Sequence, residues 1–493
     1  MNIRLLILLF LLGYSQTQSL ANNCIAKNSY ITFGDLFTLK YTAYPDSVKD
    51  HVWTIGFITQ GEGCEDLYAN NRIRLHLTSF DHVNYISKTP WLSNLYEYTY
   101  DTPTQGYKVI GAKSGDKYIR RSYQFRITDR DIYSYGFWQI SLDGVLNGQR
   151  FQFPDLHKYL HHNTEKLRIF VVADMDDTEN SKATIQKMIS IKDWYDIVIH
   201  NGDFAYNIED DIGMRGDDFF ESVREAVSTK PYLVNPGNHE NIDQGRFFNY
   251  RFRMPGLHNN QLAIRNQYYS LDIRKTHFTF FNMDWFLNIR NNLQTKIDLV
   301  KWVHDDLEKS HQFDLMFRVA FTHRPIVCGE PGNIECNFKL YIYKPFEDIL
   351  RKHQVDLVIQ AHMHDYTRLF KMYNFTDLET STLPVKSKAY ISPTYVVSGH
   401  SGNESYFPET NRLKQVSKLN QRYITGRNPN FLQVEINYKE IIASLHDCKT
   451  EEIQDFFMIV SRNVNAIMFG YTPGFSFAVW KLAFWIVIAF LIV

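Results

Sequence analysis

The pattern of apolar and polar positions divides the chain near residue 160 into two parts of different character. From about residue 25 to 160, short runs alternate apolar and polar side chains, and Gly, Asp, Asn and Pro separate these runs. The clearest runs are "RIRLHL", "SYQFRI", "WQISLDG" and "RFQF". Alternation with a period of two is typical of antiparallel strands that bury one face. The first part is therefore predicted to be a β-sandwich.

The second part contains continuous apolar runs in place of alternating ones. The first three are "LRIFVVAD", "YDIVIHNGD" and "PYLVNPGNHE", and the helix-like stretches "NSKATIQKMIS" and "GDDFFESVREAVS" separate them. Further runs of this kind are "HFTFFNMD", "LMFRVAFTH", "VDLVIQAH" and "TYVVSGH". Strands that are buried on both faces and alternate with helices predict a layered α/β domain.

Each end of the chain carries an apolar stretch. The first 21 residues combine a basic residue, an apolar run and small residues at the exit, which is typical of a secretory signal peptide, and a buried N-terminal strand is the alternative. The last stretch, "GFSFAVWKLAFWIVIAFLIV", has about the length of a membrane span, with Lys481 inside it. Small residues before it resemble a glycolipid-anchor signal, and a docked amphipathic helix is the alternative. We expect membrane attachment through this tail.

These patterns predict four segments. They are a signal peptide (1–21), a β-sandwich domain (22–160), an α/β domain (165–450) and a C-terminal segment with a hydrophobic membrane-attachment tail (451–493).

The charge is nearly balanced, with Lys+Arg 53 against Asp+Glu 54, so no basic footprint for nucleic acid is present.

The cysteines and glycosylation sequons fit a secreted protein. The short loop "CGEPGNIEC" favours a bridge between Cys328 and Cys336. A weaker expectation pairs Cys24 with Cys64, which leaves Cys448 over, although sequence alone does not fix the pairing. Two acceptor sequons begin at Asn374 and Asn403.

The apolar runs of the second part end in residues that can bind metal ions. Since ligands bind outside the carboxyl ends of such strands, these side chains should converge. The residues are Asp174, Asp203, Asn238, His239, His323, His362 and His364. A single Asp after a strand is most often a helix N-cap. The ordered set of oxygen and nitrogen donors is harder to explain by capping and favours a metal site.

The chemistry of these donors narrows the metal. Carboxylates, imidazoles and one amide, without a thiolate, suit Fe, Mn or Zn. Six or more donors exceed what one tetrahedral zinc ion takes. Two ions about 3.5–4 Å apart, bridged by a carboxylate, would use them all and would activate water and neutralise a transferring phosphoryl group.

The same motifs resemble those of the metallophosphoesterases, and among them the purple acid phosphatases and the purple-acid-phosphatase-like proteins of animals. The resemblance covers roughly residues 165–405, through "ADMDD", "GDFAYN", "PGNHE", "THRPIVC" and "AHMHDYTR". It implies a four-layer αββα metallophosphoesterase sandwich, preceded by a fibronectin-III-like β-sandwich domain.

The resemblance also implies a role for each site residue. The first, ferric ion, Fe(III), would be bound by Asp174, His364 and Tyr206, whose tyrosinate gives the family its colour. Asp203 would bridge both ions. The second ion, Fe(II), Zn or Mn, would be bound by Asn238, His323 and His362. His239 would bind phosphate and protonate the leaving oxygen, and a metal-bound hydroxide would attack phosphorus. The alternative role for Tyr206 is that of a packed aromatic side chain. The alternative role for His239 is that of a simple hydrogen-bonding neighbour of a metal ligand.

Three positions depart from the family's pattern. Asp176 stands where the family usually has glycine, so we expect it to crowd the site or to add negative charge. The loop after "HRP" lacks the substrate-binding histidine of many relatives. His400 stands where relatives carry a small residue and is read as an ordinary loop histidine. Tyr366 and Arg368 are read as structural support.

The sequence therefore predicts an acid phosphatase that is secreted or membrane-attached and hydrolyses phosphate monoesters at a dinuclear metal centre. A phosphodiesterase or nucleotide-anhydride hydrolase on the same centre is one alternative, and a catalytically impaired surface binding module is another. The expected location is the secretory pathway, with the cell surface, the extracellular space and the lysosome or vacuole left open. The oligomeric state is left open as well.

Overall fold

The computed structural model describes sixteen stretches of the chain. They are residues 24–33, 52–60, 64, 72–99, 113–160, 166–176, 178–241, 245–255, 266–287, 293–329, 340–370, 372–373, 376–377, 392–403, 420–424 and 428–461. The expected signal peptide and the hydrophobic tail lie outside these residues, as do Cys336 and Asn374. Among the helices that the structure describes, none combines the length and the apolar character needed to cross a membrane.

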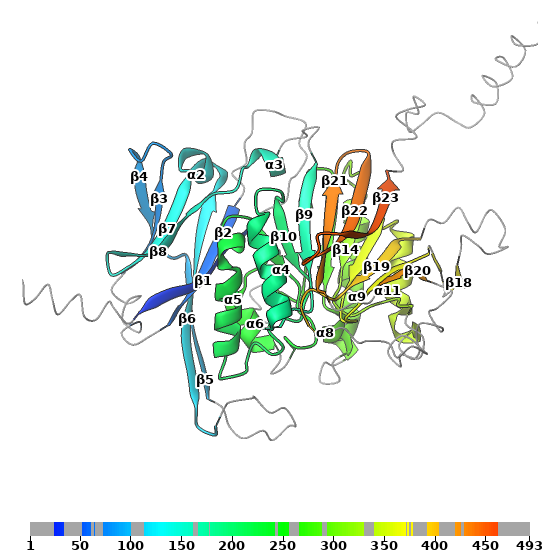
Figure 1. Ribbon diagram of the computed structural model, residues 1–493, viewed down its shortest axis with the longest axis horizontal. Coiled ribbons are helices and arrows are strands. Elements are labelled where there is room, and N and C mark those ends of the chain that lie inside the picture. The colour runs from blue at the N-terminus through cyan, green and yellow to red at the C-terminus, as the bar shows by residue number, and fades with distance from the viewer. Residues whose placement is uncertain are drawn as a thin grey trace, which may run out of the picture.

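The N-terminal part consists of two four-stranded antiparallel sheets, as the alternating pattern predicts (Figure 1). Their strand orders are β1-β2-β6-β5 and β4-β3-β7-β8. The strands are β1 (Ile25–Phe33), β2 (Val52–Gln60), β3 (Ile73–Thr78), β4 (Tyr85–Lys88), β5 (Leu92–Thr99), β6 (Lys117–Thr128), β7 (Phe137–Leu142) and β8 (Val145–Gln152). Two short helices accompany them, α2 (Asp129–Ser134) and α3 (His157–Leu160). Trp53 of β2 and Trp138 of β7 are fully buried in the core.

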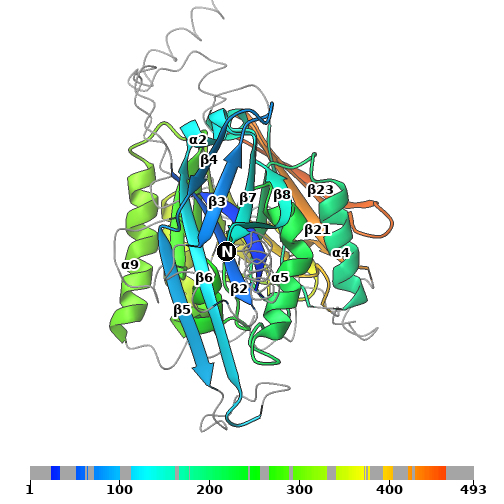
Figure 2. The same ribbon diagram turned by 90° about the vertical axis from the view of Figure 1, so that its left-hand side faces the viewer.

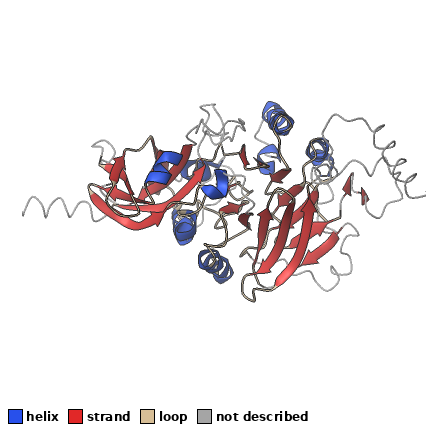
Figure 3. Cartoon of the chain, turned by 90° about the horizontal axis from the view of Figure 1, so that it is seen from above, coloured by secondary structure: helices blue, strands red, loops and turns tan. Residues whose placement is uncertain are grey.

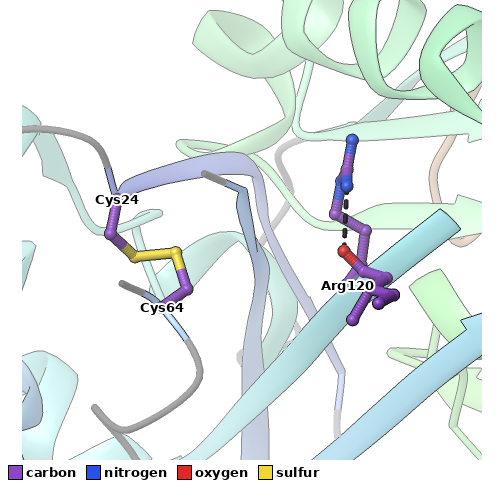
Figure 4. The surroundings of a disulfide bond; sticks show 4 residues. Cys24, Cys64 and Arg120 are labelled. Atoms are coloured by element: carbon purple, nitrogen blue, oxygen red, sulfur yellow. Dashed lines mark hydrogen bonds between the residues drawn. A yellow bond between two sulfur atoms is a disulfide. The ribbon is translucent and has the colours of Figure 1, made fainter. Parts of the chain in front are cut away.

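The cysteines pair largely as the sequence suggested. Cys24 and Cys64 form a disulfide, with 5.3 Å between their Cα atoms (Figure 4). Cys328 is also disulfide-bonded, and its expected partner Cys336 lies outside the described residues. Cys448 is a buried free thiol, which confirms that it is left over.

The second part contains two larger mixed sheets. The six-stranded sheet has the order β11-β10-β9-β21-β22-β23, and the seven-stranded sheet has the order β12-β13-β14-β15-β19-β16-β20. Their strands are β9 (Leu167–Val172), β10 (Ile197–His200), β11 (Tyr232–Val234), β12 (Tyr268–Ile273), β13 (Thr276–Phe281), β14 (Phe317–Phe321), β15 (Leu357–Gln360), β16 (Tyr366–Leu369), β19 (Thr394–Ser398), β20 (Asn420–Ile424), β21 (Asn430–Ile436), β22 (Glu440–Asp447) and β23 (Ile453–Val460). A separate hairpin joins β17 (Met372–Tyr373) and β18 (Thr376–Asp377).

Helices cover the outer sides of these two sheets. Figure 2 shows α4 and α5 on the side opposite to α9, with strands between them, and Figure 3 shows helices on both sides of the strands from above. The helices are α4 (Glu179–Ser190), α5 (Met214–Val227), α6 (Arg246–Arg251), α8 (Met283–Leu287), α9 (Leu293–Ser310) and α11 (Leu340–Lys352). Because helices lie outside both sheets, strands such as β10 and β13 are buried at every position, which explains their continuous apolar sequences.

Three C-terminal strands complete the six-stranded sheet. β21 pairs antiparallel with β9, with Leu432 opposite Val171, and β22 and β23 follow as a meander. The sheet therefore continues to Val460, ten residues past the boundary expected at 450. On the other side of β9, β10 and β11 are parallel, so their carboxyl ends meet at one edge.

The two parts of the chain are in direct contact. Strand β1 lies against α5, where Ser29 and Ser228 are hydrogen-bonded through their hydroxyls at 2.9 Å, and the backbone N–H of Asn28 donates to Glu221. Ile31 of β1 also forms a parallel bridge with Pro231, next to β11. The N-terminal part is thus packed on the same helix that covers the six-stranded sheet.

Candidate metal centre

Loops from both sheets converge at the carboxyl ends of their parallel strands. In the six-stranded sheet, the loops after β9 and β10 are paired: Asp174 N donates to Gly202 O at 3.1 Å and Met175 N to Asp203 O at 3.0 Å. The other sheet is tied to them by Asn201, whose Nδ2 donates to the carbonyls of Thr322 (2.9 Å) and Ile359 (3.3 Å). These hydrogen bonds, two of them from the Asn201 side chain, hold the ends of four strands together.

One group of predicted ligands lies at the meeting point of these loops. The hydroxyl of Tyr206 is 3.1 Å from Asp174 Oδ1 and 2.7 Å from His364 Nε2, and His364 Nε2 is 3.5 Å from Asp174 Oδ1. Asn403 Nδ2 is 3.3 Å from the same His364 nitrogen. The three residues assigned to the first ion are thus in mutual contact, and the sequon residue Asn403 belongs to the same group.

A second group forms beside the first. Asp203, His323 and His362 each offer a ligand atom, and these atoms lie within 4.8 Å of one another. The side chain of His323 is oriented by the carbonyl of Asn201, which lies 2.8 Å from Nδ1, so that Nε2 faces Asp203 Oδ2 at 3.1 Å. The Oδ1 atom of Asn238 is buried and accepts no hydrogen bond from the described residues, as expected of an oxygen held for a cation.

The electrostatics of the two groups favour a bound cation. Asp174 and Asp203 are both buried. Burial alone would lower the pKa of His323, but the negative charges of Asp203 and Asp174 outweigh it and raise this pKa to about 10. The pKa of Tyr206 is raised well above its usual value by burial and by the same two carboxylates. Since buried carboxylates are costly unless compensated, these residues fit a pair of metal ions.

Several of these residues have unusual backbone conformations. Asp174, Asp203, Tyr206 and His362 all have positive φ, between 42° and 70°. Such conformations are uncommon for residues other than glycine, and they cluster at functional sites where the surrounding structure maintains them. Four of the seven proposed ligands are therefore held in strained loops.

Glu240 organises the site although sequence reasoning did not single it out. Its buried carboxylate accepts hydrogen bonds from the backbone N–H groups of Asp203 (2.8 Å), Phe204 (2.9 Å) and Gly237 (2.8 Å). It thus clamps the loop that carries Asp203 to the loop that carries Asn238. Burial, and then the charge of Asp203, raise the pKa of Glu240 well above its usual value. The glutamate at the end of "GNHE" was the available signal.

His239 is placed beside the two groups and remains partly accessible. Its Nδ1 is 2.7 Å from Asn207 Oδ1, its ring centroid is 4.4 Å from that of Tyr206, and its backbone N–H donates to Asp203 Oδ1 at 3.1 Å. With 29% of the side chain exposed and Nε2 3.9 Å from Asp203 Oδ2, the ring borders the site rather than filling it.

Arg324, which was not predicted to be part of the site, lies beside His362. Arg324 Nη1 is 2.8 Å from His362 Nε2, and its Nε donates to Asp284 Oδ1 at 2.6 Å. A positive charge therefore lies next to the second group of ligands, within the "THRP" motif.

Asp176 does not turn its carboxylate into the group. Its Oδ1 accepts hydrogen bonds from Thr178 N (2.9 Å) and Ser181 Oγ (3.0 Å), and it therefore ties the turn before α4 to the first turn of that helix. It also lines a hollow of about 710 Å³ between α4, α5 and the start of β6, which none of the proposed metal ligands lines. These contacts therefore do not support the expectation that Asp176 crowds the metal site.

The remaining singled-out residues support the structure. Tyr366 OH and Arg368 Nε each donate a hydrogen bond of 2.8 Å to Asp455 Oδ2 of β23. His400 is buried, and its carbonyl accepts from Asn430 N at 2.7 Å. These contacts join the seven-stranded sheet to β21 and β23.

Comparison with known proteins agrees with this geometry. Residues 154–366 match the family model of the calcineurin-like phosphoesterases. Acid phosphatase type 7 from Homo sapiens is 29% identical over 306 residues, which cover 58% of this chain and 65% of that protein. Residues 154–366 of the chain are thus similar to the calcineurin-like phosphoesterases. The region shared with the human relative is a little under two thirds of that relative's length.

Further relatives extend the comparison. Purple acid phosphatase 22 from Arabidopsis thaliana is 26% identical over 220 residues, which cover 43% of this chain and 47% of that protein. Among solved structures, purple acid phosphatase PPD1 from yellow lupin (Lupinus luteus) matches with a TM-score of 0.61 at 14% identity, covering 92% of this chain and 78% of that one. This structural likeness confirms the metallophosphoesterase fold.

Proposed function

We propose that the protein is an acid phosphatase that hydrolyses phosphate monoesters at a dinuclear metal centre. The observation that carries this proposal is the convergence of two adjoining ligand groups, Asp174–Tyr206–His364 and Asp203–His323–His362. Phosphoryl transfer needs neutralisation of charge and positioning more than covalent chemistry from the protein, and two adjoining cation sites provide both.

The two groups of ligands suggest a division of labour between the ions. Asp174, Tyr206 and His364 would hold Fe(III), because a phenolate is available only to a strong Lewis acid. Asn238, His323 and His362 would hold Fe(II), Zn or Mn, and Asp203 would be shared. When bound, such a pair lowers the pKa of a coordinated water and neutralises phosphate charge.

Residues around the metal site would handle the substrate. His239 would act as an imidazolium: its Nδ1–H would donate to Asn207 Oδ1, 2.7 Å away, and its Nε2–H would be given to the leaving oxygen. Arg324, 2.8 Å from His362, brings a positive charge that would attract phosphate in place of the absent loop histidine.

The cellular setting is part of the proposal. We propose entry into the secretory pathway, loss of residues 1–21 and a fibronectin-III-like N-terminal domain over 22–160. The catalytic domain would begin at 165 and include strand β23, which ends at Val460, and the hydrophobic tail that follows would attach the protein to a membrane. Glycosylation is proposed at Asn374 and Asn403, and at Asn403 it would compete with the contact between Nδ2 and His364. The location would be the cell surface, the extracellular space or the lysosome or vacuole.

The test is hydrolysis of a chromogenic phosphate monoester at acidic pH by the full chain, compared with Asp203→Asn. We expect the variant to lose activity by about 100-fold or more, because it removes a charge shared by both ions. Asp298→Asn, an exposed aspartate on α9, is the matched control and should leave activity unchanged. Metal content and circular dichroism are measured on all three proteins.

The outcome also separates the alternative functions. Hydrolysis of a bis-ester or a nucleotide anhydride in preference to the monoester would favour the second enzyme class, which the absent loop histidine motivates. A folded protein that contains both metals and hydrolyses none of these esters would contradict the proposal and favour a binding module.

A further inference from the structure

A second cluster of metal-binding side chains lies away from the candidate metal centre. His304 and Glu308 are one turn apart on α9, so their side chains lie on the same face of the helix. His353 directly follows the end of α11. Each of the three offers a ligand atom, and these atoms lie within 4.8 Å of one another. Strand β15 separates His353 from His362, so the two clusters lie at opposite ends of that strand.

His353 is the buried member of this cluster. The residue is 2% exposed, and its Nε2 has no hydrogen-bond partner among the described residues. Its Nδ1 is 3.5 Å from Glu308 Oε2, and the rings of His353 and His304 are in edge contact at 4.9 Å between centroids. A buried imidazole nitrogen without a partner is uncommon in native structures and calls for an explanation such as a bound ion.

The surroundings of this cluster keep His353 neutral, which favours metal binding, but they also place a positive charge beside His304, which opposes it. Burial, followed by the nearby His304 and Lys352, lowers the pKa of His353 to about 4, so this imidazole is neutral and able to bind metal at ordinary pH. Lys352 Nζ, however, lies 2.8 Å from His304 Nε2. Lys352 is exposed, so its flexible side chain can turn into solvent when a cation binds, but its charge weakens the site.

We propose that His304, Glu308 and His353 bind a divalent cation of the zinc class. Two imidazoles and one carboxylate are the ligand set of three-ligand zinc sites, in which water takes the fourth position. Binding would use one ring nitrogen of His353 and would join α9 to the end of α11. This site is independent of the proposed phosphatase activity, because it shares no residue with the candidate metal centre.

The test is the zinc content of the full chain after equilibrium dialysis in buffered Zn²⁺, measured together with iron by mass spectrometry. We expect the wild type to hold one zinc ion per chain more than the double variant His304→Gln/Glu308→Gln, at equal iron content. Both residues are partly or largely exposed, so the variant should fold normally. Glu179→Gln, an exposed glutamate on α4, is the matched control and should keep the additional zinc.

A second variant tests the assigned geometry in the opposite direction. Lys352→Met should raise the zinc affinity of this site by about three- to tenfold, because it removes a positive charge beside His304. A role of the cluster limited to helix packing would not give opposite effects on zinc affinity in the two variants. Equal zinc content in wild type and double variant, or no gain in affinity in Lys352→Met, would overturn the proposal.

Discussion

At the scale of single residues, Tyr206 determines the spectroscopic character of the proposed centre. Its hydroxyl contacts Asp174 and His364, and burial beside carboxylates holds its pKa well above the usual value, so the phenolate forms only with a strong Lewis acid. We expect Tyr206→Phe to remain folded and to lose the visible absorption band of the iron-loaded protein. The band is recorded beside total iron content, and a variant that keeps the full band would contradict the assignment.

Gly237 shows how closely the site is packed. A Cβ atom built on Gly237 would lie 2.2 Å from Asp203 Oδ1 and 2.8 Å from His323 Cδ2. Gly237→Ala must therefore displace two proposed ligands, and we expect metal content to fall severalfold or more. Gly144→Ala is the control: its Cβ meets nothing within 4 Å, so it should cost only about 1 kcal/mol of backbone strain and no metal. Equal metal content in both variants would refute the idea.

The sequence revealed the candidate ligands but not the residues that hold them. Asp174, Asp203 and His323 could be predicted because each follows a buried strand, and strand ends meet at one edge. Glu240, Asn207, Arg324 and Asn403 were missed as parts of the site. Their roles depend on loops that meet only in the folded protein, and a glutamate or asparagine in a loop has no distinctive local pattern.

At the scale of elements, a buried charge cluster joins the seven-stranded sheet to α9. His277 of β13 is hydrogen-bonded to Asp272 of β12 at 2.6 Å and to Asp306 of α9 at 3.0 Å. Burial alone would lower the pKa of His277, but the two carboxylates outweigh this and raise the pKa to about 10. Breaking such a cluster leaves buried carboxylates uncompensated, so His277→Gln should destabilise the fold by about 3–5 kcal/mol near pH 6.

The pH dependence of this effect has a definite sign. Because the pKa is raised in the folded state, the contribution of His277 is fully present below its unfolded pKa of about 6.5 and is lost as pH rises through about 10. Urea unfolding of wild type and His277→Gln should therefore differ most near pH 6 and much less near pH 10. A difference that stays constant with pH would contradict this account.

The elements found from sequence are those with continuous apolar runs. The strands expected from "LRIFVVAD", "YDIVIHNGD" and "VDLVIQAH" are β9, β10 and β15. The strands of the meander β21–β23 were not among the predicted runs, and β23 lies beyond the domain boundary expected at 450. Its strands are half-exposed and alternate, as in β22, so their pattern differs from that of the buried strands in the same sheet.

At the scale of the whole molecule, Asp217 of α5 connects the two parts of the chain. It accepts from Arg251 of α6 at 2.6 Å and from Arg120 of β6 at 3.1 Å. Arg251 and Asp217 are almost fully buried. We expect Asp217→Asn to lower the free energy of unfolding by about 3–5 kcal/mol, because it removes the carboxylate partner of a buried guanidinium.

Its control is Asp218→Asn, the neighbouring exposed aspartate, which should cost no more than about 1 kcal/mol. Limited proteolysis should cleave Asp217→Asn, but not the control, between the N-terminal part and the α/β part. Equal protection of the two variants would show that Asp217 does not maintain the contact between these parts.

The pairing of β9 with β21 also bears on how the chain is made. Leu432 lies opposite Val171, 261 residues later in the sequence. At about 5–20 residues per second, a ribosome needs roughly 13–50 s to deliver β21 after β9 has emerged. During that time one edge of β9 has no neighbour, and an unpaired apolar edge is a site where chains associate. Recovery of soluble protein should therefore depend on chaperones that bind nascent chains, and on translation speed between β9 and β21.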